Sequence, residues 1–379
     1  FSFGGIEIVS KIVEGKFPLE GMVAKLNSGF HIGPAYYYLL YPFYWALDLD
    51  PVAAGVFAGV VATATSVVFY ILVRALFSPG TALVALGIYA FSSHIIVRDR
   101  IAWPVIFLPV LATIIYYLLV RLMEGKMQYL PRLGLTLGAS LHIHFTSVFF
   151  FLYTIVCLPF FVRAKGFVRF ALMSLPLFLI WLIPTYIANM QHGFSQGAQV
   201  FSYIQTYYHG FHVVRVIQLV PEVLIEFGSI LGVSQFRFLK YIMLPVFLAL
   251  YWRRHSTGRG LRVCFLTALW FVVPLVVFSL YSGEISDYYF VVTRPIVIMI
   301  YAYVTTELFR LHRAVILILT VLFWVYILYF NINLFFRNNY GNHLPKIRQE
   351  VRTVILNGGT INFTEGDPKS YLYYLYAQR

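Results

Sequence analysis

The chain has 379 residues, of which 60% are hydrophobic, 11% are charged and 19% are aromatic, and its mean hydropathy is +0.78. A soluble globular protein carries roughly 25% charged residues, so this composition excludes a soluble enzyme. The net charge of +13 does not indicate a nucleic-acid-binding protein, because the basic residues lie in short clusters between apolar runs. We therefore predict an integral membrane protein that contacts membrane lipids and no nucleic acid.

Ten apolar runs predict the part of the chain that lies in the membrane. Runs of about 20 apolar residues cross the ~30 Å hydrocarbon core as helices, because lipid offers the backbone no hydrogen-bond partner. The runs lie at 52–73, 80–97, 102–122, 133–146, 148–162, 168–188, 236–252, 263–281, 288–308 and 314–333. The predicted fold class is all-α, a polytopic transmembrane bundle of about ten helices within residues 51–334.

The segments outside this bundle are more polar. Residues 1–50 contain an amphipathic stretch from Ile6 to Phe17 and a Tyr-rich run at 32–47, and we predict an outer loop whose helices lie in the headgroup plane. Residues 335–379 are predicted to form a small extracytoplasmic tail. Residues 216–233 are apolar, but a span there would reverse the topology downstream, so we predict an outer interfacial or re-entrant helix.

Lys and Arg predict the orientation of the bundle. Their clusters fall in alternate connections, and the positive-inside rule places those connections in the cytoplasm. These connections lie near 74–79, 121–132, 163–169, 253–262 and 310–313. The protein is thus predicted to lie in the plasma membrane, with its acidic residues and its site on the outer face.

Ionisable residues at the membrane edge are candidates for function, because placing them there is unfavourable. Arg98, Asp99 and Arg100 follow one apolar run, and two guanidinium groups with a carboxylate can hold a lipid phosphate. The alternative is a solvated loop whose charges pair with one another. Arg294 lies more than one turn into a later run, where it either snorkels outward or holds an anion.

Two residue pairs have spacings that bear on function. His142 and His144 are two residues apart and point to different faces of the predicted helix, which is the wrong spacing for a helical metal pair. Either one of them faces an outer cavity or both make structural hydrogen bonds. Glu222 and Glu226 are four residues apart and share a helix face, predicted to be the wet face of an interfacial helix, with a charged cavity wall as the alternative.

The stretch His31-Ile32-Gly33-Pro34-Ala35-Tyr36-Tyr37-Tyr38-Leu39-Leu40 resembles a family motif. It is similar to the H-x-G-P-L-Y-Y-Y-L motif of bacterial family 39-type glycosyltransferases. These belong to the GT-C superfamily, with the protein O-mannosyltransferases and the lipid A aminoarabinose transferase. Shorter segments at 50–54, 98–103, 287–290 and 359–363 are also similar to parts of that family, so the resemblance covers nearly the whole chain.

The resemblance implies an enzyme that moves a sugar from a polyprenyl-phosphate donor to a lipid, glycan or protein acceptor at the outer membrane face. It implies a carboxylate general base, for which the candidates are Glu7 and Asp99. It implies that basic and aromatic residues bind the substrates, with these candidates: His31, Tyr37, Arg98, Arg100, His144, Tyr289 and Arg294. No cofactor and no metal site are expected, with a divalent metal ion as the alternative.

One departure from the family pattern leaves other functions open. Gly4 stands where the family has an acidic residue soon after its first helix, so the base precedes Phe1, or Glu7 replaces it, or activity is lost. The last case would make the chain a non-catalytic relative. The other alternative is a transporter or flippase for lipid-linked sugars, which should have ionisable groups in mid-membrane and repeat symmetry. The clustering of charges at the outer edge favours the transferase.

Overall fold

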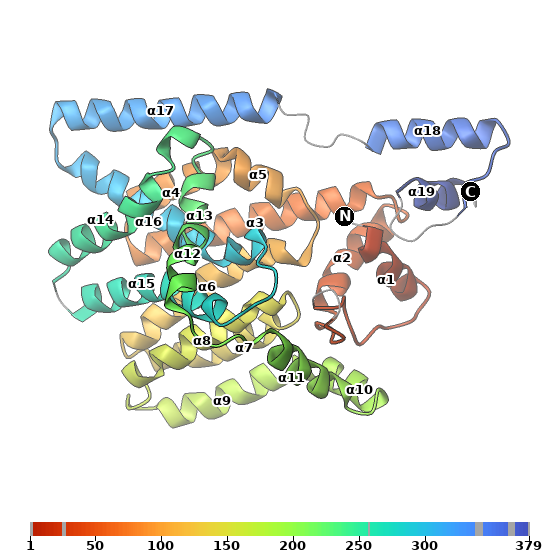
Figure 1. Cartoon of the computed structure of the whole chain (residues 1–379), viewed down its shortest axis with the longest axis horizontal. Coiled ribbons are helices and arrows are strands. Elements are labelled where there is room, and N and C mark those ends of the chain that lie inside the picture. Colours follow the sequence, from red (N-terminus) through yellow and green to blue (C-terminus); the bar gives the residue numbers. More distant parts are fainter. Residues whose placement is uncertain (1–2, 25–27, 257, 338–343, 363–367, 378–379) are drawn as a thin grey trace.

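The computed structural model describes residues 3–24, 28–256, 258–337, 344–362 and 368–377. Within these residues the chain is helical, and extended backbone pairs only at two isolated bridges, Val23 with His31 and Tyr208 with Tyr281. Many of the long helices run side by side in one bundle, and both termini lie at the same end of it (Figure 1). The all-α prediction is confirmed.

Five helices of the described chain are long and apolar enough to cross a membrane. They are α3 (Val52–Leu76), η1 with α6 (Pro104–Met123), α15 (Gly258–Ser279), η6 with α16 (Asp287–Arg310) and α17 (Ala314–Arg337). Two bent pairs pass the same test, namely α4 (Pro79–Phe91) with α5 (Ser93–Asp99), bent by 67°, and α9 (Phe167–Leu179) with α10 (Leu182–Gln191), bent by 50°. The protein is thus an integral membrane protein with five to seven candidate spans.

The other predicted runs form shorter helices, which are α7 (Leu130–Ser140), α8 (Val148–Cys157) and α14 (Leu239–Arg254). At 1.5 Å per residue α7 is about 16 Å long, roughly half of a hydrocarbon core. It ends before the predicted end of its run because the backbone turns at residues 141–144, where His144 caps the following 3₁₀ turn. Each predicted run therefore contains a helix, but bends and short helices replace a set of ten straight spans.

Helix α16 lies at the centre of the bundle, and its position fixes the candidate site. It packs against α4, α6, α14 and α17, and 94% of its apolar stretch is buried. Tyr153 of α8 stacks on Trp270 of α15, with ring centroids 4.0 Å apart. The Trp270 indole N–H donates to the Val292 carbonyl at 2.8 Å, just before α16 begins at Arg294. This packing fixes where the first residue of α16 lies in the core.

The N-terminal segment and the tail lie at the same end of the molecule (Figure 1). Helices α1 (Phe3–Val13) and α2 (Ala35–Ala46) share an apolar cluster with the start of α3. The tail contains α18 (Leu344–Leu356) and α19 (Pro368–Ala377). Arg348 of α18 forms an ion pair with Asp50, and the Tyr371 hydroxyl donates to the Leu49 carbonyl at 3.0 Å. The division into 1–50, 51–334 and 335–379 stays a prediction.

Short helices connect α10 to α14. They are α11 (Ser195–Tyr207), α12 (Val213–Val223), α13 (Ile225–Ser229) and η5 (Ser234–Phe236). The helix is interrupted at Leu224, which separates α12 from α13, and Pro221 lies inside the last turn of α12. Glu222 and Glu226 therefore lie in different helices and share no helix face. The prediction of a wet face is wrong for Glu226, which is 2% exposed.

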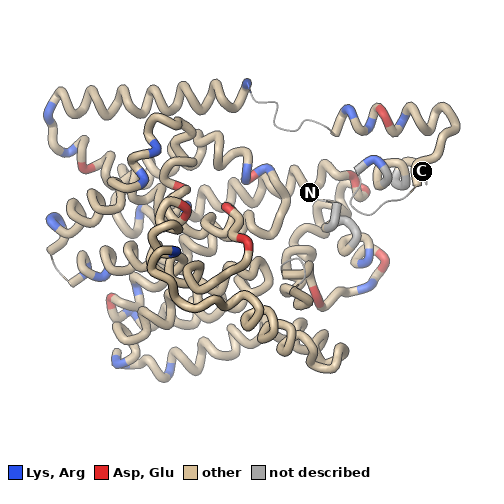
Figure 2. Tube along the Cα trace, viewed as in Figure 1, with Lys and Arg blue, Asp and Glu red and all other residues tan. Residues whose placement is uncertain are grey.

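The basic connections gather along one edge of the bundle, shown at the left of Figure 2. Glu124 forms ion pairs with Arg121 at 3.0 Å, with Lys126 at 3.2 Å and with Arg259 at 3.1 Å. Arg259 also donates to the Leu76 carbonyl at 3.2 Å, and Glu307 pairs with Arg254 and Arg310. These contacts bring four of the five predicted cytoplasmic connections to one end of the molecule.

Candidate functional site

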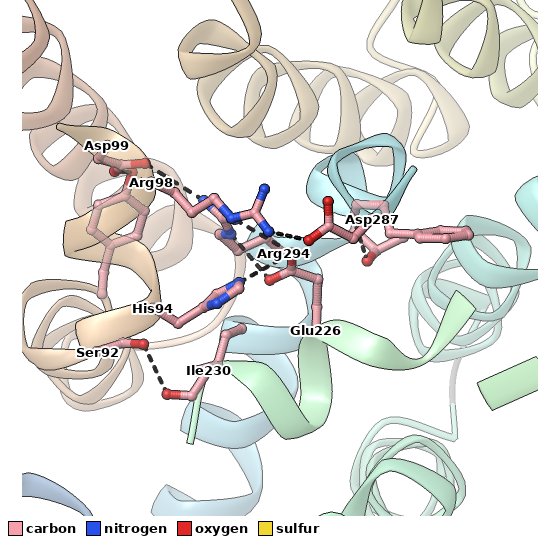
Figure 3. A network of polar contacts seen from close by, with 11 residues as sticks. Ser92, His94, Arg98, Asp99, Glu226, Ile230, Asp287 and Arg294 are labelled. Atoms are coloured by element: carbon pink, nitrogen blue, oxygen red, sulfur yellow. Dashed lines mark hydrogen bonds and ion pairs between the residues drawn. The ribbon is translucent and has the colours of Figure 1, made fainter. Parts of the chain in front are cut away.

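A cluster of buried charges lies around Arg294, the first residue of α16 (Figure 3). Its Nε and Nη2 atoms donate to the Glu226 carboxylate at 3.1 and 3.3 Å. Its Nη1 atom lies 3.5 Å from Asp99 Oδ1. Because Arg294 is 1% exposed, it neither snorkels outward nor holds a free anion, but is enclosed by two carboxylates from two other elements. Arg294 thus joins α5, α13 and α16 in one ionic cluster.

A tyrosine and a histidine, Tyr89 and His94, complete the cluster. The Tyr89 hydroxyl of α4 donates to Asp99 Oδ2 at 2.7 Å. His94 Nε2 of α5 lies 3.7 Å from Glu226 Oε1. Burial by itself raises the pKa of the Glu226 carboxyl, but Arg294 and His94 outweigh burial and lower that pKa below its usual range. Glu226 is thus ionised and serves as the permanent counter-ion of Arg294.

The predicted triplet of Arg98, Asp99 and Arg100 does not pair with itself. Asp99 turns inward to Arg294, whereas Arg98 forms an ion pair with Asp287, across the gap to η6 (Figure 3). Arg100 is exposed, its guanidinium lies 6.0 Å from the centre of the Phe335 ring, and it has no ion pair among the described residues. The solvated, self-paired alternative is wrong because α5 sends consecutive side chains in different directions.

Asp99 lines two separate cavities. The α3 cavity has a volume of about 370 Å³ and is lined by Tyr89, Asp99, Arg100 and small residues along one side of α3, namely Gly55, Gly59, Ala62, Thr63 and Ser66. The Trp103 cavity has a volume of about 40 Å³ and contains Arg98, Asp99, Trp103, Tyr288 and Arg294 in its wall. Asp99 therefore borders a larger cavity beside α3 and a smaller cavity whose wall contains the aromatic residues Trp103 and Tyr288.

His144 and Tyr289 line a third cavity, of about 80 Å³, together with Tyr203, Phe278 and Tyr281. The Tyr288 ring lies 5.6 Å from the ring of His144 and 4.6 Å from that of Trp103, so aromatic rings connect this cavity to the Trp103 cavity. His144 also accepts a hydrogen bond from the Thr146 N–H at 3.1 Å. Of the two alternatives for the histidine pair, His144 thus combines a structural bond with a cavity wall.

The remaining predicted site residues lie in the N-terminal segment, away from the Arg294 cluster. His31 Nδ1 is 3.7 Å from the Glu20 carboxylate, and Tyr37 is 3% exposed in the apolar cluster of α1, α2 and α3. Glu7 lies in α1, and its side chain is outside the described part of the structure. The structure therefore groups Asp99, Arg98 and Arg294 but not His31 or Tyr37 with them.

Within the motif around His31, Gly33 has a structural role. A Cβ atom placed on Gly33 would overlap the His142 imidazole, so only glycine lets the loop approach that ring. His142 Nε2 in turn bonds to the Trp181 carbonyl. This part of the family motif thus holds the N-terminal loop against the turn after α7.

Residue patterns missed two members of the cluster, Tyr89 and His94, which carry no motif. Glu226 is a candidate from the sequence, but its predicted position on a wet face is wrong. The available signal was Glu226 itself, an acid within an apolar segment that contains a helix break, since buried acids need a cationic partner. As for metals, no group of three or more His, Cys, Asp or Glu in the described ranges is arranged to hold a metal ion.

Comparison with known proteins identifies the fold. No protein-family model and no curated protein matches the chain. Two solved structures match 99% of it, namely ArnT from Cupriavidus metallidurans bound to undecaprenyl phosphate, with a TM-score of 0.57 and 11% identity, and the same protein in the apo state, at 0.56 and 12%. The chain has the fold of ArnT. It spans 70% and 63% of those two chains.

At this level of identity the likeness shows the fold alone. The shared fold agrees with the transmembrane helix bundle that the resemblance implies. The assignment to family 39 and the similarity to protein O-mannosyltransferases stay predictions.

Proposed function

We propose that this protein is a GT-C glycosyltransferase that moves a sugar from a polyprenyl-phosphate donor to a lipid, glycan or protein acceptor. The observation that carries the proposal is the position of Asp99, a residue that lines both the α3 cavity and the Trp103 cavity. The likeness to ArnT, one structure of which holds undecaprenyl phosphate, supports a polyprenyl-phosphate substrate. The family 39-type motif at 31–40 supports the same class of reaction.

In this proposal the α3 cavity takes the donor. Small residues on α3 line this cavity of about 370 Å³ and would face the isoprenoid chain, and the exposed residue Arg100 lines it next to Asp99. A guanidinium binds phosphate oxygens through two parallel hydrogen bonds. Arg100 therefore holds the donor phosphate and stabilises the charge that develops as this phosphate leaves.

Asp99 is the general base of the proposed reaction. It takes the proton of the acceptor hydroxyl, whose oxygen bonds to the anomeric carbon of the sugar while the bond from that carbon to the phosphate oxygen breaks. The polyprenyl phosphate leaves with the electron pair of that bond. The acceptor reaches Asp99 through the Trp103 cavity, where Trp103 and Tyr288 supply aromatic faces. Glu7 remains the second candidate for the base.

The proposed location of the site is the outer face of the plasma membrane. The Arg294 cluster lies at the start of α16, whereas Glu307 and the basic connections lie at its other end. With the basic connections in the cytoplasm, as the positive-inside rule requires, the start of α16 faces outward.

A transfer assay tests the proposed function. The full-length protein in detergent is given radiolabelled polyprenyl-phosphate sugars and a membrane lipid extract, and label is sought on a new acceptor. We expect transfer by the wild type and a loss of about 100-fold in Arg100→Gln, because a donor to the leaving oxyanion is removed. Arg74→Gln, an exposed arginine at the basic end of α3, is the matched control and should transfer normally.

Two outcomes would reject the proposal. Binding of the labelled lipid without any transfer would favour a transporter or a flippase, and neither binding nor transfer would favour a non-catalytic relative. Equal loss in Arg100→Gln and Arg74→Gln would contradict the placement of the donor phosphate.

A further inference from the structure

The position of Asp99 depends on a sharp break in the chain. Helices α4 and α5 meet at an angle of 67° at Ser92. Helix α5 has seven residues, and a helix of this length is not stable by its own hydrogen bonds. Its direction must therefore be set by contacts with the rest of the fold, which include the packing of Ile95 in the core and the polar contacts at its first residue. Asp99 closes α5 about 9 Å from Ser93, so a small rotation at the first residue moves the carboxylate away from Arg294.

One side-chain amide holds the start of α5. The backbone N–H and the hydroxyl of Ser93 both donate to Asn331 Oδ1, at 2.9 and 2.8 Å. Asn331 Nδ2 donates to the Leu231 carbonyl at 2.8 Å. A second bond joins the same two segments, since the Ser92 hydroxyl donates to the Ile230 carbonyl at 2.8 Å (Figure 3). We call these five residues the Asn331 latch.

The latch links the two elements that supply the carboxylates of the site. Helix α5 carries His94 and Asp99, and Ile230 directly follows α13, which carries Glu226. Asn331 itself lies on α17, which also packs against α4 and α5 and places Phe335 near Arg100. The distance between the two carboxylate-bearing segments is thus set from a third helix.

The surroundings of Asn331 show that this amide is held in a specific place. It is 1% exposed, although only 17% of the apolar stretch of α17 is buried. An amide in an apolar environment is unfavourable unless its bonds are made, and both polar atoms of Asn331 are bonded. Gly232 has φ +71°, and a Cβ atom there would lie 2.9 Å from Asn331 Oδ1. The backbone after Leu231 therefore fits closely around the amide.

We propose that Asn331 is a positioning residue, which holds α5 and the segment after α13 so that Asp99 and Glu226 meet Arg294. Asn331 lines neither the α3 cavity nor the Trp103 cavity. It acts through its hydrogen bonds to Ser93 and Leu231. The inference rests on the proposed transfer reaction for its effect on rate, but the holding of α5 can be measured without that reaction.

Hydrogen exchange tests the latch directly. Asn331→Leu keeps the size of the side chain and removes its hydrogen bonds. We expect the amides of residues 93–99 and 225–231 to exchange at least about 10-fold faster in this variant, because local opening becomes easier. Thr320→Val is the matched control, since Thr320 is buried on the same helix and its hydroxyl bonds, among the described residues, only to the Ile316 carbonyl. Wild-type exchange at residues 93–99 in Asn331→Leu would overturn the proposal.

A second variant separates a specific latch from general loss of folding. Asn331→Asp can reproduce the amide only when its carboxyl is protonated, because a donor must face the Leu231 carbonyl. We expect the protection of residues 93–99 in this variant to approach that of the wild type at pH 5 and to fall by pH 8. Protection that is equally low at both pH values would contradict the latch.

The transfer assay then shows whether the latch serves the reaction. With the latch and the proposed function both correct, Asn331→Leu transfers at least about 10-fold more slowly than Thr320→Val. Faster exchange with unchanged transfer would reject the positioning role. Faster exchange in Asn331→Leu, together with a wild type that shows no transfer at all, would reject the proposed function and leave the latch as a structural contact.

Discussion

Charged side chains form clusters at both ends of α16, and the two clusters differ in how far their side chains are exposed to solvent. At the start of α16, Arg294 and Glu226 have side chains that are 1% and 3% exposed. At the other end, the Glu307 side chain is 14% exposed and pairs with Arg254 and Arg310, whose side chains are 45% and 40% exposed. The guanidinium groups are thus buried at one end and open to solvent at the other.

This difference separates function from topology. An exposed ion pair contributes roughly 0–1 kcal/mol, because water and salt screen it, so the basic end needs no exact geometry. A buried pair gains little net stability over apolar side chains, yet breaking it leaves an uncompensated charge. Stability alone therefore does not explain a buried ionic cluster, and buried ionisable groups in membrane proteins are candidates for functional sites.

The largest expected effect comes from removing the central cation. Arg294→Leu leaves Glu226 and Asp99 buried without a counter-ion, and we expect a loss of about 3–5 kcal/mol in the free energy of unfolding. Equilibrium unfolding in detergent measures this loss. Arg310→Leu is the control at the other end of α16 and should change stability by about 1 kcal/mol or less. Equal losses in the two variants would remove the contrast between the two ends.

Neutralising one carboxylate should have an intermediate effect. Glu226→Gln keeps an oxygen that accepts from Arg294 but removes the charge, and we expect a loss of about 1–3 kcal/mol in the free energy of unfolding. The same measurement on the Arg294→Leu background should show a smaller loss, because the partner is already gone. Additive losses would mean that the two residues do not act as one cluster.

The glycine of the family motif should affect stability and not chemistry. Gly33→Ala forces a methyl group against His142, and overpacking of this kind costs about 1–3 kcal/mol. The thermal midpoint should fall, while the KM for the polyprenyl-phosphate donor stays at the wild-type value. A rise in that KM with an unchanged midpoint would instead place the motif in the donor site.

The smallest effect is expected at the basic end. Glu307→Gln removes the partner of Arg254 and Arg310 and should lower the free energy of unfolding by about 1 kcal/mol or less. Raising the salt concentration should abolish even this difference, because exposed pairs are screened. Unfolding at low and high salt measures it, and a loss above that of Glu226→Gln would contradict the account.

Much of the fold was accessible from the sequence. Each apolar run contains a helix, because hydrocarbon leaves the backbone no other way to satisfy its hydrogen bonds. Helix α2 lies within the predicted Tyr-rich stretch, whereas α1 overlaps the predicted amphipathic stretch only from Ile6 to Val13. The hydrophobic periodicity could not predict the 67° break at Ser92 or the early end of α7, because both depend on contacts with distant segments.

The site was accessible only in part, for the same reason. Asp99 and Arg294 were candidates because each is an ionisable residue at a membrane edge. Their pairing spans almost 200 positions of sequence, and the third member, Glu226, lies on a separate short helix. Charge patterns show which residues need partners, but the packing of α4, α13 and α16 decides which partners they find.

The most direct test of the account is transfer by Asp99→Asn, measured beside Glu307→Gln. Asparagine keeps an oxygen that can accept from the Tyr89 hydroxyl but cannot take the acceptor proton. We predict that Asp99→Asn loses about 10²–10⁴-fold in kcat while remaining folded, and that Glu307→Gln transfers at the wild-type rate. Wild-type transfer by folded Asp99→Asn would contradict the account and move the general base to Glu7 or elsewhere.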